Sequence, residues 1–260
     1  MKTNEQKIYY TLRFASAMCF IGHGAFGIIT KEIWCNYFAV FGIGHQTAYT
    51  LMPYLGTVDI LMGISLLFYP TRTVLSWLVI WGMITALLRP LSGEPFAEFI
   101  ERAGNFGAPL ALLILSGKNI KGFFVKINPV SNADAAILSK VALCLRIVVF
   151  LLFAGHGWLN LIDKKALLSQ YSSLGFSDPS NVAQIAGIFE IAAACFVLIK
   201  PVRSVLIFLF VWKAVSELFY PHWEIFEWIE RGGSYGSILA LWFVTERSVS
   251  PNKKFMMAGS

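Results

Sequence analysis

Long apolar stretches follow one another along almost the whole chain, separated by short polar segments. Most approach the roughly 20 residues that an α-helix needs to cross the hydrocarbon core of a bilayer. We place eight of them, at about 8–29, 48–69, 74–91, 96–115, 138–162, 182–199, 202–219 and 225–244. The pattern therefore predicts an all-α, polytopic membrane protein with eight transmembrane helices surrounded by the lipid bilayer.

Polar residues inside the apolar first half return at matching places in the second half. They include the pairs Arg13 and Arg146, His23 and His156, Asp59 and Glu190, Glu98 and Glu227, Glu101 and Glu230, and Arg102 and Arg231. Because four spans return the chain to its starting side, we expect two parallel four-helix repeats about an axis along the membrane normal. The first repeat would occupy 1–122 and the second 137–250, with a cytoplasmic linker at 123–136 and a C-terminal tail at 251–260.

Composition and charge agree with a membrane location. Hydrophobic residues make up 57% of the chain and charged residues 14%, which is unusual for a soluble domain. Most lysines and arginines fall at the end that holds both termini, so the positive-inside rule places both termini in the cytoplasm, with the protein in the inner cell membrane. The net charge of +6 follows from this bias. Lysines scattered over loops do not form the contiguous basic face of a nucleic-acid-binding protein.

The cysteines do not suggest redox chemistry of their own. Cys19, Cys35, Cys144 and Cys195 form no C-x-x-C pair, and three of them lie in predicted spans. Free cysteine in such a place behaves as a small apolar residue. A relay of thiols and disulfides is therefore not expected.

The topology fixes the depth of the ionisable residues. The outer half of the first repeat would hold His23, Asp59, Arg89, Glu98, Glu101 and Arg102, and that of the second would hold His156, Glu190, Lys213, Glu217, Glu227, Glu230 and Arg231. One charged residue at the centre of a membrane helix costs about 2.5 to 3.5 kcal/mol on insertion scales. These side chains must therefore pair, line a hydrated recess or bind a ligand. We expect one recess in each repeat, opening toward the exterior.

Each group also has a structural interpretation. The two Gly-His-Gly motifs can be packing histidines with glycines for close helix contact, and the Glu-x-x-Glu-Arg motifs can cap the start of a helix. Arg13 and Arg146 are expected to snorkel toward the cytoplasmic surface. Asp59 and Glu190, near the middle of their spans, are the hardest to explain by structure alone.

No established metal-binding motif is present, and we assign no metal ligands. The chain has no His-Glu-x-x-His and no Glu-x-x-His pair of the di-iron type. A mixed site of His23, Asp59, Glu98 and Glu101 across the helices of one repeat stays open. Haem held by His23 and His156 would require the first and fifth helices to face each other.

The repeat unit resembles the DoxX/DoxD family of small four-helix membrane proteins. The resemblance covers most of each copy and rests on Arg13, Gly22, Gly24, Gly56, Asp59 and Arg72, and on Arg146, Gly155, Gly157, Gly187, Glu190 and Arg203. Some members are subunits of a thiosulfate:quinone oxidoreductase. The resemblance therefore implies a quinone-linked redox role or an accessory membrane subunit.

Three functions follow from these observations. The first is a quinone-linked oxidoreductase, or its membrane subunit beside a redox partner, in which His23 or His156 hydrogen-bonds the quinone and Asp59 or Glu190 relays a proton. Arg89 and Lys213 are further candidates to contact the quinone. The second is a transporter or channel for protons, metal ions or a small polar solute. The third is a structural or assembly subunit.

The two copies differ at positions that could decide between them. Lys213 and Glu217 align with Gly82 and Ala86, and Arg89 aligns with Tyr220. The two recesses are therefore not electrostatically equal, and one can work while the other supports it.

Overall fold

The computed structural model describes residues 2–117, 122–129, 131–218 and 225–248. Within these ranges the chain is helical apart from loops and one isolated bridge between Thr71 and Lys126. The helices are α1 (Asn4–Ile28), α2 (Trp34–Ala39), α3 (His45–Phe68), α4 (Arg72–Leu91), α5 (Ala97–Glu101), α6 (Ala103–Leu115), α7 (Ala135–Leu161), α8 (Lys165–Ser173), α9 (Pro179–Ile199), α10 (Arg203–Leu218), α11 (Ile225–Glu230) and α12 (Gly232–Ser248). The predicted all-α class is confirmed.

Two of the predicted spans are broken helices. The stretch predicted at 96–115 divides into α5 and α6 at Arg102, and the stretch at 225–244 divides into α11 and α12 at Arg231. At the first break the backbone N–H of Arg102 donates to Phe99, and that of Asn105 donates to Arg102. These i to i+3 bonds tighten the chain into a turn. In each Glu-x-x-Glu-Arg motif the two glutamates lie in the short helix and the arginine lies at the break.

Four helices are long and apolar enough to cross a membrane, namely α3, α4, α7 and α9. Their outward faces carry large apolar side chains that are more than half exposed, such as Phe68, Ile80 and Ile188. Contiguous exposed apolar surface of this kind is typical of contact with lipid. The helices therefore indicate a bilayer environment.

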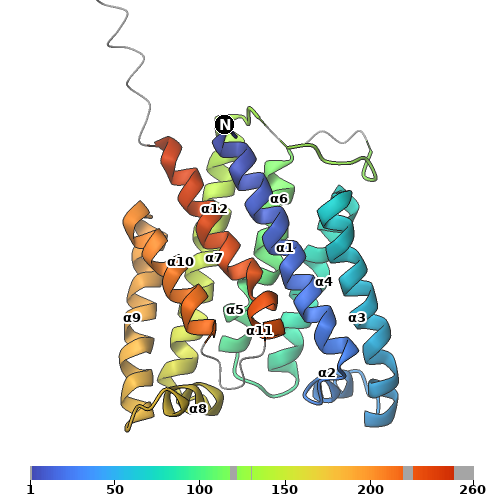
Figure 1. Ribbon diagram of the computed structural model, residues 1–260, viewed down its shortest axis with the longest axis vertical. Coiled ribbons are helices and arrows are strands. Elements are labelled where there is room, and N and C mark those ends of the chain that lie inside the picture. Colours follow the sequence, from blue (N-terminus) through green and yellow to red (C-terminus); the bar gives the residue numbers. More distant parts are fainter. Residues whose placement is uncertain (1, 118–121, 130, 219–224, 249–260) are drawn as a thin grey trace, which may run out of the picture.

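The helices form a central group with two flanking pairs (Figure 1). In the centre, α1 packs against α12 and α6, and α7 packs against the same two helices. On one side α3 packs against α1 and α4 against α6, while on the other α9 packs against α7 and α10 against α12. The short helices α2, α5, α8 and α11 lie toward the end opposite the N-terminus (Figure 1).

Glycines set the distance between each central helix and its flanking partner. A Cβ on Gly24 would lie 2.5 Å from the carbonyl oxygen of Gly56, and one on Gly157 would lie 2.8 Å from that of Gly187. Real Cβ atoms do not approach backbone oxygens so closely, so α1 and α3, like α7 and α9, depend on residues without side chains at the crossing. This contact brings Asp59 beside α1 and Glu190 beside α7.

The end that holds the N-terminus is filled by apolar side chains. Buried residues here include Ile8, Leu12, Leu66, Leu112, Leu145 and Leu206. Arg13 and Arg146, which we expect to snorkel, donate to backbone carbonyls: Arg13 Nε lies 2.8 Å from the Leu66 oxygen, and Arg146 Nη2 lies 3.0 Å from the Ile199 oxygen. They satisfy carbonyls that the ends of α3 and α9 leave unpaired.

The predicted linker at 123–136 contacts the bundle through Ile127. The Ile127 N–H donates to the Pro70 carbonyl at 2.7 Å, and the Tyr9 hydroxyl donates to the Ile127 carbonyl at 2.8 Å. Because α7 begins at Ala135, the last two linker residues belong to a helix. The predicted tail at 251–260 lies outside the described residues.

Replacing Gly24 with alanine tests the close crossing of α1 and α3. We expect the clash with the α3 backbone to cost about 1 to 3 kcal/mol, more than the gain of up to about 1 kcal/mol in helix propensity. The midpoint of thermal unfolding in mild detergent should fall. Gly44→Ala is the matched control, because a Cβ there has no neighbour within 4 Å; an equal shift in both variants would contradict the assignment.

Candidate functional site

In the first half, the half-buried His23 pairs with the buried Asp59. His23 Nδ1 lies 2.8 Å from Asp59 Oδ2, and the Asp59 residue is 1% exposed. The imidazole also packs against the Trp34 ring, with centroids 4.6 Å apart. When Nδ1–H donates to Asp59, Nε2 is left to accept or donate a proton elsewhere.

A cavity of about 640 Å³ adjoins this pair. Aromatic and aliphatic side chains form much of its wall, among them Phe26, Trp34, Tyr37, Phe38, Leu55 and Trp81. Phe41 and Tyr54, which also line it, are 63% and 69% exposed, so the cavity reaches the surface of the protein. An apolar pocket of this size with a few polar groups is typical of a small-molecule site.

Arg89 lines the same cavity together with groups that the sequence did not single out. Its Nη1 lies 3.0 Å from Glu94, and its guanidinium stands 5.4 Å from the Tyr37 ring centre. The Tyr37 hydroxyl donates to Glu94 at 2.6 Å. Burial raises the pKa of the Tyr37 phenol, so this hydroxyl stays protonated and keeps its donor role. Tyr37 and Glu94 lie in connections between predicted spans, where nothing in the sequence distinguished them from ordinary loop residues.

The matching pair in the second half is enclosed by other side chains. His156 Nδ1 lies 2.6 Å from Glu190 Oε2. Glu190 also accepts hydrogen bonds from Asn160 at 3.2 Å and from Trp212 Nε1 at 3.1 Å, and the Tyr171 hydroxyl donates to Asn160 at 2.8 Å. Among the described residues, by contrast, His23 is the side chain that hydrogen-bonds Asp59. The second carboxylate is therefore saturated by the protein, whereas the first faces a cavity.

Lys213 and Glu217 fill the region beside the second pair. Their side chains lie 2.5 Å apart and are 0% and 6% exposed. They align with Gly82 and Ala86, and Ala86 lines the cavity of the first half. A difference of two side chains thus distinguishes the cavity in one half from an ion pair in the other.

The sequence predicts that the acids of the two helix breaks join the histidine of their own half. The structure places Glu101 and Glu230 against the opposite half instead. A Cβ on Gly22 would lie 2.7 Å from Cα of Glu230, and a Cβ on Gly155 would lie 2.7 Å from Cα of Glu101. The short helix α11 therefore packs on α1, and α5 packs on α7. Glu101 lies beside His156 of the other half, so the open alternative of one site formed by His23, Asp59, Glu98 and Glu101 within the first repeat does not form, because the short helices pack across the halves.

Ion pairs follow the same crossed arrangement. Lys31 pairs with Glu227, and Lys164 pairs with Glu98. Arg231 Nη1 lies 2.9 Å from Glu101, which also accepts from Arg102 Nη1 at 3.0 Å. Both lysines stand in short connections, where nothing in the sequence distinguished them from ordinary surface charges. The result is one network that joins the two halves.

Arg102 and Glu98 complete the network on the side of the first half. Arg102 Nη1 lies 2.5 Å from Glu98 Oε2, an i to i+4 pair across the break. Arg89 approaches the same Glu98 oxygen at 3.4 Å. Because Glu98 is 1% exposed, these cations offset a desolvation cost that an isolated carboxylate could not meet.

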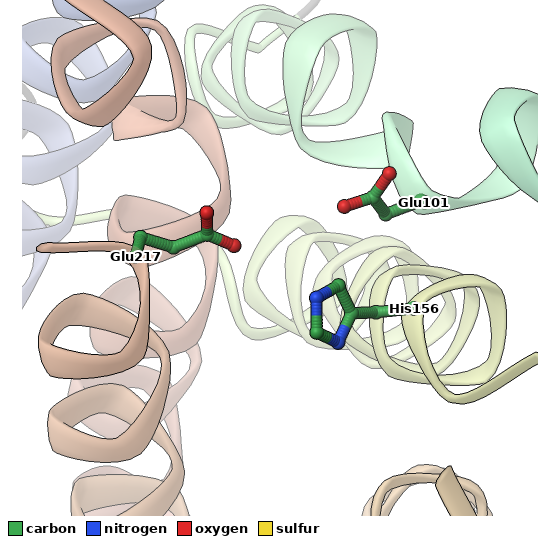
Figure 2. A group of neighbouring side chains, drawn as sticks. All are labelled: Glu101, His156 and Glu217. Atoms are coloured by element: carbon green, nitrogen blue, oxygen red, sulfur yellow. The ribbon is translucent and has the colours of Figure 1, made fainter. Parts of the chain in front are cut away.

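Glu101, His156 and Glu217 form the group among the described residues that comes nearest to a metal site (Figure 2). One potential ligand atom of each lies within 4.8 Å of the others. Both carboxylates, however, already contact Arg231 at 2.9 Å, and Glu217 also contacts Lys213. With these cations in place, the group is an ion-pair cluster, and a divalent ion would have to displace them.

Joint ligation of haem by His23 and His156 does not fit the arrangement of the helices. Helices α6 and α12 contact each other between α1 and α7, with Gly104 against Gly233. Each imidazole is instead turned to the carboxylate of its own half.

Comparisons with known proteins identify no relative. No family model matches the chain, and neither the curated proteins nor the solved structures contain a match.

Replacing Arg231 with glutamine tests the network that joins the halves. Glu101 and Glu217 would then lose a shared cation, and we expect a loss of about 3 to 5 kcal/mol in the free energy of unfolding. Titration with SDS in mild-detergent micelles measures it. Arg72→Gln is the control, because Arg72 donates to the Ser116 carbonyl rather than to a carboxylate, and should lose about 0.5 to 1.5 kcal/mol. Equal losses would argue against the network.

Proposed function

We propose that the protein binds a quinone in the first-half cavity and serves as a quinone-linked membrane oxidoreductase or as the membrane subunit of one. The observation that carries the proposal is the His23–Asp59 pair at an apolar, aromatic-lined cavity that reaches the protein surface. A quinone ring needs apolar walls for its faces and polar groups for its two oxygens. The cavity offers both.

His23 is the group we assign to proton exchange. Reduction of a quinone to a quinol consumes two electrons and two protons. Nε2 of His23 would hydrogen-bond one ring oxygen and pass a proton to it, while Asp59 holds the ring orientation and stabilises the imidazolium. The second proton would come from water at the cavity mouth. A redox partner subunit of the dehydrogenase class would supply the electrons.

The proposal assigns different tasks to the two histidines. Among the described residues, Asn160, Trp212 and the Lys213–Glu217 ion pair surround the His156–Glu190 pair, so a ring would have to displace these side chains. We therefore assign the quinone to His23 and Arg89, and a supporting role to His156 and Lys213.

We further propose that the chain is a tandem pair of DoxX-like four-helix units with eight membrane spans and both termini in the cytoplasm. Matching contacts in the two halves support this arrangement. They include the glycine crossings at Gly24 and Gly157, and the pairs Lys31–Glu227 and Lys164–Glu98. In this orientation the cavity belongs to the outer leaflet of an inner cell membrane.

A transporter or channel is less well supported. The ion pairs described above lie at one end, whereas the described core of the other end is mostly apolar, apart from groups such as Glu5, Arg13 and Arg146. A polar solute crossing the bundle would have to open that core. An assembly role would use the ion network but would give the His23–Asp59 pair no reason to face a cavity.

Quinone retention tests the proposal. The protein purified in mild detergent should retain extractable quinone, and His23→Gln should lower the retained amount by about 10-fold or more, because a charge-assisted hydrogen bond is lost. Chromatography of the extract with redox detection measures this amount. His156→Gln is the matched control and should retain the wild-type amount. Folded wild-type protein that carries no quinone and takes up none from added menaquinone would contradict the proposal.

A further inference from the structure

The contacts made in the closed second half indicate which chemical group of a ligand would bind in the first-half cavity. Glu217 stands where the first half has Ala86, a residue of the cavity wall. The Glu217 carboxylate lies 2.9 Å from Arg231 Nε and within 4.8 Å of a ring nitrogen of His156. In Figure 2 a ring nitrogen of His156 points into the space between Glu101 and Glu217. In the second half, a carboxylate of the protein itself therefore lies beside the arginine and the histidine.

The first half has the same two hydrogen-bond donors, an arginine and a histidine, without that carboxylate. Arg102 aligns with Arg231 and lines the cavity. Its bonds to Glu98 and Glu101 all use Nη1, so Nε and Nη2 make no hydrogen bond within the described part of the chain. His23 is likewise bonded through Nδ1 alone among these residues. The arginine and histidine that lie beside the Glu217 carboxylate in the second half therefore correspond to residues that line the cavity in the first half.

We propose, resting on the quinone function above, that the ligand carries a negatively charged ring oxygen held by Arg102 and His23. The ligand class is a hydroxyquinone or a singly deprotonated quinol. The Glu217 carboxylate, with Lys213, occupies the equivalent place and closes the second half. Each chain accordingly binds one ligand.

The net charge around the cavity does not by itself require an anionic ligand. The wall holds five lysines and arginines and four aspartates and glutamates, and four of these cations also pair with Glu98 or Glu101. The proposal therefore depends on the donors of Arg102 and His23 that the described protein leaves unused. Glu230 faces the same cavity from α11 and would oppose a second anion. Its counterpart Glu101 nevertheless lies within 4.8 Å of Glu217, with His156 beside both. The second half thus tolerates two carboxylates around one imidazole when an arginine joins them.

Two ring probes of nearly equal shape separate charge from ring binding. At neutral pH 2-hydroxy-1,4-naphthoquinone is an anion, whereas 2-methyl-1,4-naphthoquinone is neutral. Quenching of tryptophan fluorescence reports binding, because Trp34 and Trp81 line the cavity. We expect Arg102→Gln to weaken the anionic probe by about 10-fold or more and the neutral probe by less than about threefold. Equal weakening of both probes overturns the proposal.

Variants outside the ion network protect the test against misfolding of Arg102→Gln. Ala86→Glu should supply the missing carboxylate and abolish binding of the anionic probe, while Ala86→Ser leaves the cavity open and should bind as the wild type does. Retained anionic binding in Ala86→Glu overturns the proposal.

The number of probe molecules bound per chain tests whether Lys213 and Glu217 close the second half. Lys213→Gly combined with Glu217→Ala should raise the bound anionic probe from one to two per chain, measured by equilibrium dialysis. A stoichiometry that stays at one overturns the assignment of Glu217 as the group that closes this half. Failure of the wild type to bind either probe contradicts the quinone function itself, whereas binding without charge preference contradicts only the anionic ligand.

Discussion

Charged side chains can be buried in an apolar bundle only if each one meets a compensating charge or donor, and the rest of this structure depends on that constraint. Part of this compensation comes from the other half of the chain. Arg231 holds Glu101, Lys31 holds Glu227, and Lys164 joins Glu98. The short helices that carry these acids must consequently lie against the opposite half. Glycines on α1 and α7 make room for their backbones.

The same constraint explains why the two halves differ so sharply around similar histidines. In the second half a carboxylate on α10 is buried together with its own lysine, and the pair fills the available space. In the first half glycine and alanine stand at those positions, and the space remains a cavity. Asp59 thus keeps an oxygen for a ligand or water, while Glu190 is saturated by three side chains.

Much of the fold could be predicted from periodic features of the sequence. Apolar length located most of the long helices, and the expected topology placed His23 in the same region as Asp59 and His156 in the same region as Glu190, where the structure joins them as pairs. Recurrence could not show which helices pack together. The same motifs would recur whether the short helices packed on their own half or on the opposite half. The break at Arg102 was missed for a related reason: hydropathy averages over a turn.

Crossed pairing within one polypeptide has a consequence for how such a molecule can diversify. Two identical chains with this architecture would carry every substitution twice, and a lysine and glutamate at the positions of Lys213 and Glu217 would close both cavities at once. Carrying the two halves in a single chain removes that coupling. One half can then specialise as scaffold, while the other keeps its cavity.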